Sequence, residues 1–482
     1  MKVRTIRTNY ALNLTRTVLS TVISLFTLPY INSTLGVVSV GKFEYVNSIV
    51  SYFVLFSALG VPMYGIREIA RVRNDPARRT KVTVELLLVL AITTVFSYLL
   101  LFGFFIQLDF LQSYRSLILV LAPSIFLSNL GMEWFFQGIE DQLYITIRFI
   151  IIKIVTLILL FTLIKSPDDY VLYGLIMTIS AFGSNFFNFF YIRKFLEFKT
   201  LKWKELNVRK HIQGIFTIFL ATVSIAIYLQ LDNTLLGIYG GPEHVGIYAT
   251  ANKLVRFAIL FITTLGSVML PRLSYLYAQN DQSQYYAYLS KNLSYILFFS
   301  VPSTVLLFSL AKPIILVMAG DEFIAAVAPM KILTALLPIV GIAYFLAFMV
   351  LYPQGRENVY TKVVFVSAVI SVFLNVALIP HYFEMATAIV SVVVEFAAVL
   401  LMILYVRNRL SSFRLFKQTH FNYLFGGCIV FILSQIVAYY VVHPIVNIVA
   451  TVCIGMLLYM VFLYYMKDPI YSYIIKKISS IR

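Results

Sequence analysis

The sequence predicts an all-α membrane protein that crosses the bilayer many times. Hydrophobic residues make up 60% of the 482 residues and charged residues only 12%, whereas soluble proteins carry about twice that share of charge. Many apolar runs reach the length of about 20 residues that an α-helix needs to cross ~30 Å of hydrocarbon. These observations together indicate a polytopic helical protein.

The apolar runs divide into fourteen expected membrane-spanning helices joined by short connections. They cover residues 9–31, 43–65, 82–107, 115–138, 143–164, 170–192, 214–238, 245–271, 292–318, 328–352, 358–379, 384–406, 421–442 and 445–466.

The basic residues of the connections predict the orientation. In the connections and the span ends next to them, 28 Lys and Arg residues fall on one side of the membrane and five on the other. Cytoplasmic connections carry the excess of positive charge, so we expect both termini in the cytoplasm. The net charge of +17 is therefore explained by basic residues that determine the membrane orientation. We expect no nucleic-acid partner.

An internal duplication predicts the domain organisation. The segments VGKFEYVNSIV (40–50) and VGIYATANKLV (245–255) share Val, Gly, Asn and Val at an offset of 205. Later matches follow in the same order, which favours a repeat over chance. We expect an N-terminal six-helix bundle, a basic cytoplasmic linker, a C-terminal six-helix bundle, and two extra helices with a tail. Their bounds are 1–195, 196–213, 214–408 and 409–482.

Six is an even number, so the two halves share one membrane orientation. We expect them to be related by a pseudo-two-fold axis along the membrane normal, with a binding site between them.

Six charged residues fall deep inside the predicted spans, where each charge costs roughly 2.5–3.5 kcal/mol or more. One explanation is that these residues form structural ion pairs between helices, but two of the four cations would then lack partners. A hydrated cavity with net positive charge explains the two additional cations better, and it suits an anionic substrate such as a phosphate ester. The cations are Arg16, Lys153, Lys253 and Arg256, and the anions, as charge partners or coupling groups, are Asp232 and Glu395.

Polar residues accompany these charges at helical spacing. Such stripes serve either as contacts between helices or as the wall of a cavity, and the neighbouring charges favour the wall. The expected lining residues are Asn13, Asn47, Tyr228 and Asn252.

Other features point to ordinary structural roles. Glu44, Glu85, Glu133 and Arg148 lie near span ends, where a long side chain can reach the membrane surface. The two cysteines, Cys428 and Cys453, lack the spacing of a metal site and are expected in the core. The sequence has no phosphate-binding Walker loop, and we expect neither an enzyme nor a cofactor or metal.

Three further segments are informative: LGVVSVGKFEYVNS, GVPMYGIREIARVRNDP and LDNTLLGIYGGPEHVGIYATANKLVR. Together they resemble the polysaccharide transporter family of the MATE-like MOP flippase superfamily. Asp232 and Lys253 fall inside the third segment.

This resemblance implies a Wzx-type flippase of the bacterial inner membrane for O-antigen, capsule or exopolysaccharide. Such a protein moves undecaprenyl-pyrophosphate-linked oligosaccharides to the outer leaflet by alternating access. The resemblance also implies two bundles around a V-shaped cavity, with a polysaccharide polymerase and a chain-length regulator as expected partners.

Three alternatives stay open. A lipid II flippase would also need cationic groups and fourteen helices. A MATE-type multidrug or cation antiporter would need a cavity dominated by carboxylates. A scaffold of a polysaccharide assembly complex would gain little from buried charges.

Overall fold

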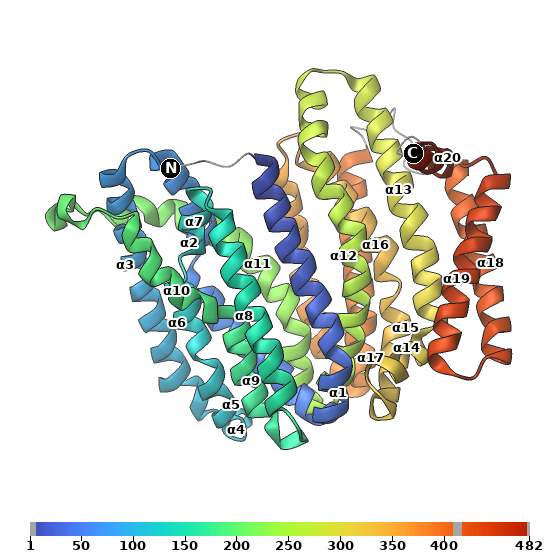
Figure 1. Cartoon of the computed structure of the whole chain (residues 1–482), viewed down its shortest axis with the longest axis horizontal. Helices are drawn as coiled ribbons and strands as arrows, with labels where there is room; N and C mark the ends of the chain where they lie inside the picture. Colours follow the sequence, from blue (N-terminus) through green and yellow to red (C-terminus); the bar gives the residue numbers. More distant parts are fainter. Residues whose placement is uncertain (1–5, 408–416, 480–482) are drawn as a thin grey trace. The chain divides into compact units, whose positions relative to one another are not determined.

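A computed structural model describes residues 6–407 and 417–479 of the chain, and every regular element in these residues is a helix (Figure 1). No side chain is described for residues 6–11, 14, 200, 221, 222, 224–229, 264–268, 474 and 476–479. The chain divides into two compact units, Met1–Gly246 and Ile247–Arg482.

The first unit contains eleven α-helices among the residues that the structure describes. They are α1 (Ile6–Ala58), α2 (Val61–Val72), α3 (Pro76–Gly103), α4 (Asp109–Gln112), α5 (Arg115–Leu121), α6 (Pro123–Leu130), α7 (Glu133–Gly138), α8 (Gln142–Leu163), α9 (Tyr170–Thr178), α10 (Ser184–Tyr191) and α11 (Arg209–Tyr239). Short helical turns connect them: η1 (Phe105–Gln107), η2 (Pro167–Asp169), the π-helix η3 (Ile179–Gly183), η4 (Ile192–Lys194), η5 (Phe198–Thr200) and η6 (Trp203–Glu205).

Helix α1 consists of two helices joined at a sharp break. Its 53 residues would span about 80 Å if straight, far more than the thickness of a bilayer. Gly36 interrupts the helix with φ 71° and ψ 171°, a conformation that only glycine adopts readily. Helix α1 packs against α3, α6, α8, α9 and α11, so it lies at the centre of the first unit.

A core of apolar side chains holds α2, α3 and α7 together. Trp134, Phe135 and Phe136 of α7 are buried against Ile69 of α2 and Leu86 of α3. These large rings exclude water from one end of the unit and fix α7 in place. The position of Glu133, the first residue of α7, follows from this packing.

The second unit contains most of α12 (Pro242–Ala278), which begins in the first unit. It continues with α13 (Gln282–Ser309), α14 (Ala311–Met318), η7 (Asp321–Ala326), α15 (Val327–Leu333), α16 (Leu336–Tyr344), the π-helix η8 (Phe345–Leu351), α17 (Glu357–Arg407), α18 (Gln418–Tyr440), α19 (Pro444–Tyr465) and α20 (Pro469–Ser479). Helix α17 is also broken, at Phe383 (φ 45°, ψ −125°) after Pro380. Helices α18 and α19 pack side by side, with α18 against α13 (Figure 1).

The prediction of a polytopic all-helical membrane protein is confirmed. Within residues 6–407 and 417–479, ten helices are long and apolar enough to cross a membrane, and one bent helix pair raises the number to eleven. Large apolar side chains such as Phe373 and Leu404 are exposed, as expected for a surface covered by lipid. The cysteine prediction was wrong: Cys428 and Cys453 are exposed, because α18 and α19 turn these positions away from the core.

Helix α11 packs against α1 and α2, inside the first compact unit. The sequence analysis assigned this helix to the second six-helix half. That assignment was based on the internal repeat and not on packing. The predicted domain bounds stay a prediction.

Two glycines of the duplicated segments meet within the first unit. A Cβ atom on Gly41 would collide with the carbonyl oxygen of Pro242, and one on Gly246 would collide with that of Val37. Gly41 corresponds to Gly246, and Val37 to Pro242, at the offset of 205. The contact is therefore reciprocal, and both positions require glycine because the obstacle is main chain.

Candidate functional site

Arg16, the first of the predicted deep cations, lies on α1 beside an acidic partner. Its guanidinium Nη1 is 3.6 Å from Oε2 of Glu133, and Nη2 donates to Oδ1 of Asn13 at 3.1 Å. The side chain of Arg16 is 20% exposed and that of Glu133 is 38% exposed. Two predicted site residues, Arg16 and Asn13, are thus in direct contact.

Glu133 also binds a second arginine. Nη2 of Arg148 on α8 donates to Oε1 of Glu133 at 2.6 Å, and Nη1 contacts Ser184 and Asn185 of α10. The Arg148 side chain is only 7% exposed. The expectation that Arg148 reaches the membrane surface was wrong, because its charge is satisfied inside the protein. We call this group the Arg16–Glu133–Arg148 cluster.

Lys153 lies farther along α8 against the π-helix η3. Its ammonium donates to Oγ of Ser180 at 2.7 Å and lies 5.5 Å from the centre of the Phe149 ring. Among the described residues no carboxylate lies within salt-bridge distance of Lys153. π-helical turns are frequent at functional sites because they shift side chains out of the regular helical register, and here the turn carries Ser180.

The polar groups facing α8 form one seam. Ser180 bonds Lys153 and Ser184 bonds Arg148, whereas Asn188, four residues further, donates to the carbonyl of Gly131. The charged ends of Arg148 and Lys153 therefore contact hydrogen-bonding groups of η3 and α10. Two cations share this seam with one carboxylate, so the local charge is positive.

Asp232 lies on α11 and is buried, with 9% exposure. Thr234 on the same helix is 2.8 Å from Ser48 of α1. Asn47, next to Ser48, is half-buried. The side chain of Tyr228 lies outside the described residues.

The remaining predicted residues lie in the second unit. Nε of Arg256 donates to Oδ1 of Asn252 at 3.0 Å, and both Arg256 and Lys253 are exposed on α12. Tyr248 is buried and bonds Ser391 of α17 at 3.0 Å, so it braces α12. Glu395 of α17 is half-buried. Convergence of these residues with Arg16 and Lys153 stays a prediction.

A further polar network was not expected from the sequence. Glu85 of α3 is fully buried; its Oε2 is 2.9 Å from Nε2 of His211 and 2.8 Å from the ammonium of Lys210. Nδ1 of His211 is 2.8 Å from the hydroxyl of Tyr64, and the amide of Asn207 donates to Oε1 of Glu85. This network ties the basic linker to α2 and α3.

Sequence reasoning missed this network because Glu85 was placed at a span end with access to water. The signal that could have found it is the Lys210–His211 pair directly after the basic segment. Within the described part of the chain, no group of three His, Cys, Asp or Glu side chains could hold a metal ion.

The fold defines the class of protein to which the chain is similar. It superimposes on the lipid II flippase MurJ in an inward closed conformation with a TM-score of 0.76 at 16% identity, covering 95% of this chain and 99% of that chain. A MATE structure in complex with MaL6 matches with a TM-score of 0.54 at 15% identity, covering 82% and 93%. The fold is that of the MurJ and MATE transporters.

The sequence comparisons then give the family. The model of the polysaccharide biosynthesis protein family matches residues 6–277, more than half of the chain, and the MatE model matches residues 217–380. The chain belongs to the polysaccharide biosynthesis protein family, and the resemblance to polysaccharide transporters of the MOP superfamily is confirmed.

Two relatives carry the name "Putative O-antigen transporter". The protein from Shigella dysenteriae is 25% identical over 282 residues, which is 58% of this chain and 69% of that protein. The protein from Escherichia coli (strain K12) is 20% identical over 250 residues, which is 52% of this chain and 60% of that protein.

Proposed function

We propose that the chain is a flippase for lipid-linked oligosaccharides. It would move undecaprenyl-pyrophosphate-linked repeat units from the cytoplasmic to the outer leaflet of the inner membrane, for O-antigen, capsule or exopolysaccharide. Family membership, the names of the two relatives and the fold shared with a lipid II flippase support this proposal. It is a transporter and not an enzyme.

The observation that carries the proposal is the positive seam of the first unit. Arg16, Arg148 and Lys153 lie on spanning helices with Glu133 as the carboxylate of the cluster. A pyrophosphate has several anionic oxygens, and arginine forks match such oxygens with two parallel hydrogen bonds. Cationic drugs would need the opposite charge balance, which disfavours a multidrug antiporter.

In the proposed mechanism, Arg16, Lys153, Lys253 and Arg256 bind the pyrophosphate in a cavity that opens alternately to each side. Asn13, Asn47, Tyr228 and Asn252 contact the sugars, and the polyprenyl chain stays in the lipid. Asp232 and Glu395 either pair with cavity cations or carry the ion that drives the cycle.

Fourteen crossings fit the observed elements. The broken helices α1 and α17 each supply two crossings, because 53 and 51 residues exceed the ~20 residues of one span. Helix α11, which has 31 residues, adds another. The reciprocal contact of Gly41 and Gly246 supports two six-helix halves related by a pseudo-two-fold axis.

The termini are proposed to lie in the cytoplasm, as the basic residues of the connections require. A polymerase and a chain-length regulator are the proposed protein partners. The second candidate function is lipid II transport, favoured by the TM-score of 0.76 with MurJ.

The test is the substitution Arg256→Ala. Losing one charge-assisted phosphate contact costs about 1.5–3 kcal/mol, so we expect translocation to fall about tenfold or more. Lipid-linked repeat units should then accumulate on the cytoplasmic face, measured by their accessibility to an added glycosidase in inverted vesicles. Arg115→Ala, an exposed arginine at the start of α5, is the matched control.

Normal surface polysaccharide in the Arg256→Ala strain, at normal protein level, would count against the proposal. Transport of lipid II by the purified chain without transport of the oligosaccharide would favour the second candidate. Reconstituted protein that moves neither lipid would leave the scaffold role as the better explanation.

A further inference from the structure

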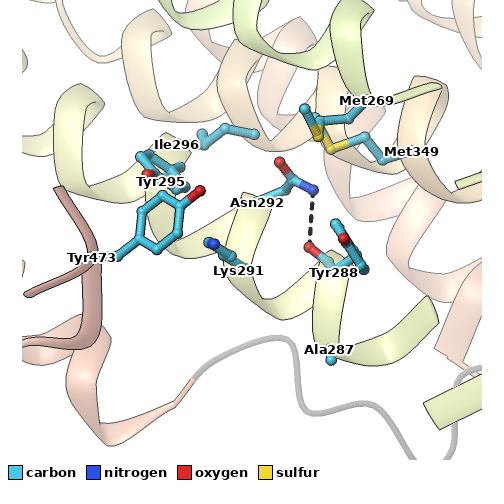
Figure 2. A pocket seen from close by; sticks show the side chains of 9 residues that line it. All are labelled: Met269, Ala287, Tyr288, Lys291, Asn292, Tyr295, Ile296, Met349 and Tyr473. Carbon is cyan, nitrogen blue, oxygen red and sulfur yellow. Dashed lines mark hydrogen bonds between the residues drawn. The ribbon is translucent and has the colours of Figure 1, made fainter. Parts of the chain in front are cut away.

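A pocket of about 480 Å³ lies in the second unit, between α13 and the C-terminal helix α20 (Figure 2). Lys291, Asn292 and Tyr295 of α13 line it together with Tyr473 of α20. Met269 of α12 and Met349 of η8 close the opposite side, as Figure 2 shows. One wall is thus polar and cationic and the other is apolar, an arrangement that suits an amphipathic ligand.

The cation of the pocket lies against an aromatic face. The Lys291 ammonium is 3.2 Å from the centre of the Tyr473 ring, and Lys291 also lines the pocket. A second cation, Arg272, lies over the ring of Tyr288, another lining residue. Among the described residues, neither Lys291 nor Arg272 forms an ion pair with a carboxylate, so neither charge is neutralised by direct contact.

The span bounds predicted from the sequence would place the pocket at the depth of the lipid headgroups. Lys291 directly precedes the apolar run 292–318, and Arg272 directly follows the run 245–271. Three of the lining residues, Tyr288, Tyr295 and Tyr473, are tyrosines, a residue that is enriched where a membrane protein meets the interface.

The start of helix α20 is fixed by its N-cap. Asp468 is buried, and its Oδ1 accepts from the amides of Ile470 and Tyr471 at 2.9 and 3.0 Å. The next residues of α20 include Ile470, which is buried, while Lys476 and Lys477 follow in the sequence. An amphipathic helix with basic residues lies in the membrane interface and is attracted by anionic lipids.

From these contacts we infer that the pocket between α13 and α20 binds the phosphate headgroup of an anionic phospholipid. Lys291 and the phenol hydroxyls of Tyr295 and Tyr473 donate to the phosphate oxygens. The methionine side accommodates the apolar part of the lipid, which a soluble phosphate compound lacks. The site is separate from the proposed transport residues and does not depend on the flippase activity.

The test measures retention of labelled phosphatidylglycerol by the purified full chain in phosphatidylcholine mixed micelles. One lysine near an anionic headgroup contributes about 1 kcal/mol, so Lys291→Gln should weaken phosphatidylglycerol binding about fivefold, and Lys291→Arg should restore it. Tyr473→Ala changes an exposed position of a surface helix and should weaken binding as well. It provides the second measurement if Lys291→Gln fails to fold.

Lys331→Gln is the matched control, since Lys331 also lies over an aromatic ring, that of Phe308, but on the opposite predicted side of the membrane. Unchanged phosphatidylglycerol binding by Lys291→Gln, or an equal loss in Lys331→Gln, would overturn the inference. Displacement of the lipid by millimolar inorganic phosphate would assign the pocket to a soluble phosphate compound and overturn the lipid assignment. Displacement by added phosphatidylglycerol alone would support it.

Discussion

Glu133 interacts with two guanidinium groups, and this arrangement determines the free energy of burying each charged arginine. Arg148 is almost fully enclosed, so its charge depends on Glu133 and on the neutral partners Ser184 and Asn185. Arg16 is more exposed and lies at the longer distance of 3.6 Å. Glu133 therefore forms the stronger ion pair with Arg148. The guanidinium of Arg16 is the one better able to bind an additional anion.

The substitution Glu133→Gln should destabilise the protein by about 2 kcal/mol, because a buried charge loses its partner. The measurement is the free energy of unfolding in detergent. Asp168→Asn, at an exposed carboxylate, should leave it unchanged. Combining Glu133→Gln with Arg148→Gln should cost less than the sum of the two single changes, and strict additivity would show that the bridge contributes nothing.

Long helices in this protein are subdivided by a few special residues. Gly36 and Phe383 break α1 and α17 at positive φ, and the π-helices η3 and η8 each insert a wider turn between α-helical segments. These irregular segments allow side chains such as Ser180 to face a charged neighbour. The number of continuous helices therefore says little about how many times the chain crosses the membrane, because α1 and α17 each contain two helical segments.

Gly41→Ala should prevent α1 from packing against the first turn of α12, because the added methyl group would strike the carbonyl of Pro242. We expect a loss of several kcal/mol, seen as aggregation or absent monodisperse protein after extraction. Gly103→Ala is the matched control, since nothing lies within 4 Å of the added atom there. A stable Gly41→Ala protein would contradict the close approach of the two helices.

At the scale of the whole molecule, the topology can be tested with single cysteines in a chain whose native cysteines are replaced by serine. Ser33→Cys and Tyr382→Cys, next to the two helix breaks, should react with a membrane-impermeant maleimide in intact cells. Asn280→Cys, at the turn between α12 and α13, should react only after permeabilisation. If Ser33→Cys also required permeabilisation, α1 would not form two crossings with the break outside.

Composition predicted the fold class because hydrophobic length and the side preference of Lys and Arg are local properties of the sequence. Asn13 beside Arg16 and Asn252 beside Arg256 were also predictable, since residues three or four apart share a helix face. The partner of Arg16 was not, because Glu133 lies far away along the chain and depends on how α7 packs. The role of Ser180 depends on a π-helical turn, and such a turn has no periodic pattern by which it could be recognised in the sequence.

The reciprocal contact between Gly41 and Gly246 has a consequence for genetics. Each position is restricted by the main chain of the other repeat, at Pro242 and Val37. A smaller side chain at either of those positions cannot remove a carbonyl oxygen, so no local substitution should suppress a Gly41→Ala defect. Suppressor mutations should instead map to residues that allow α1 and the first turn of α12 to shift relative to one another. The two repeats should also have retained both glycines as they diverged.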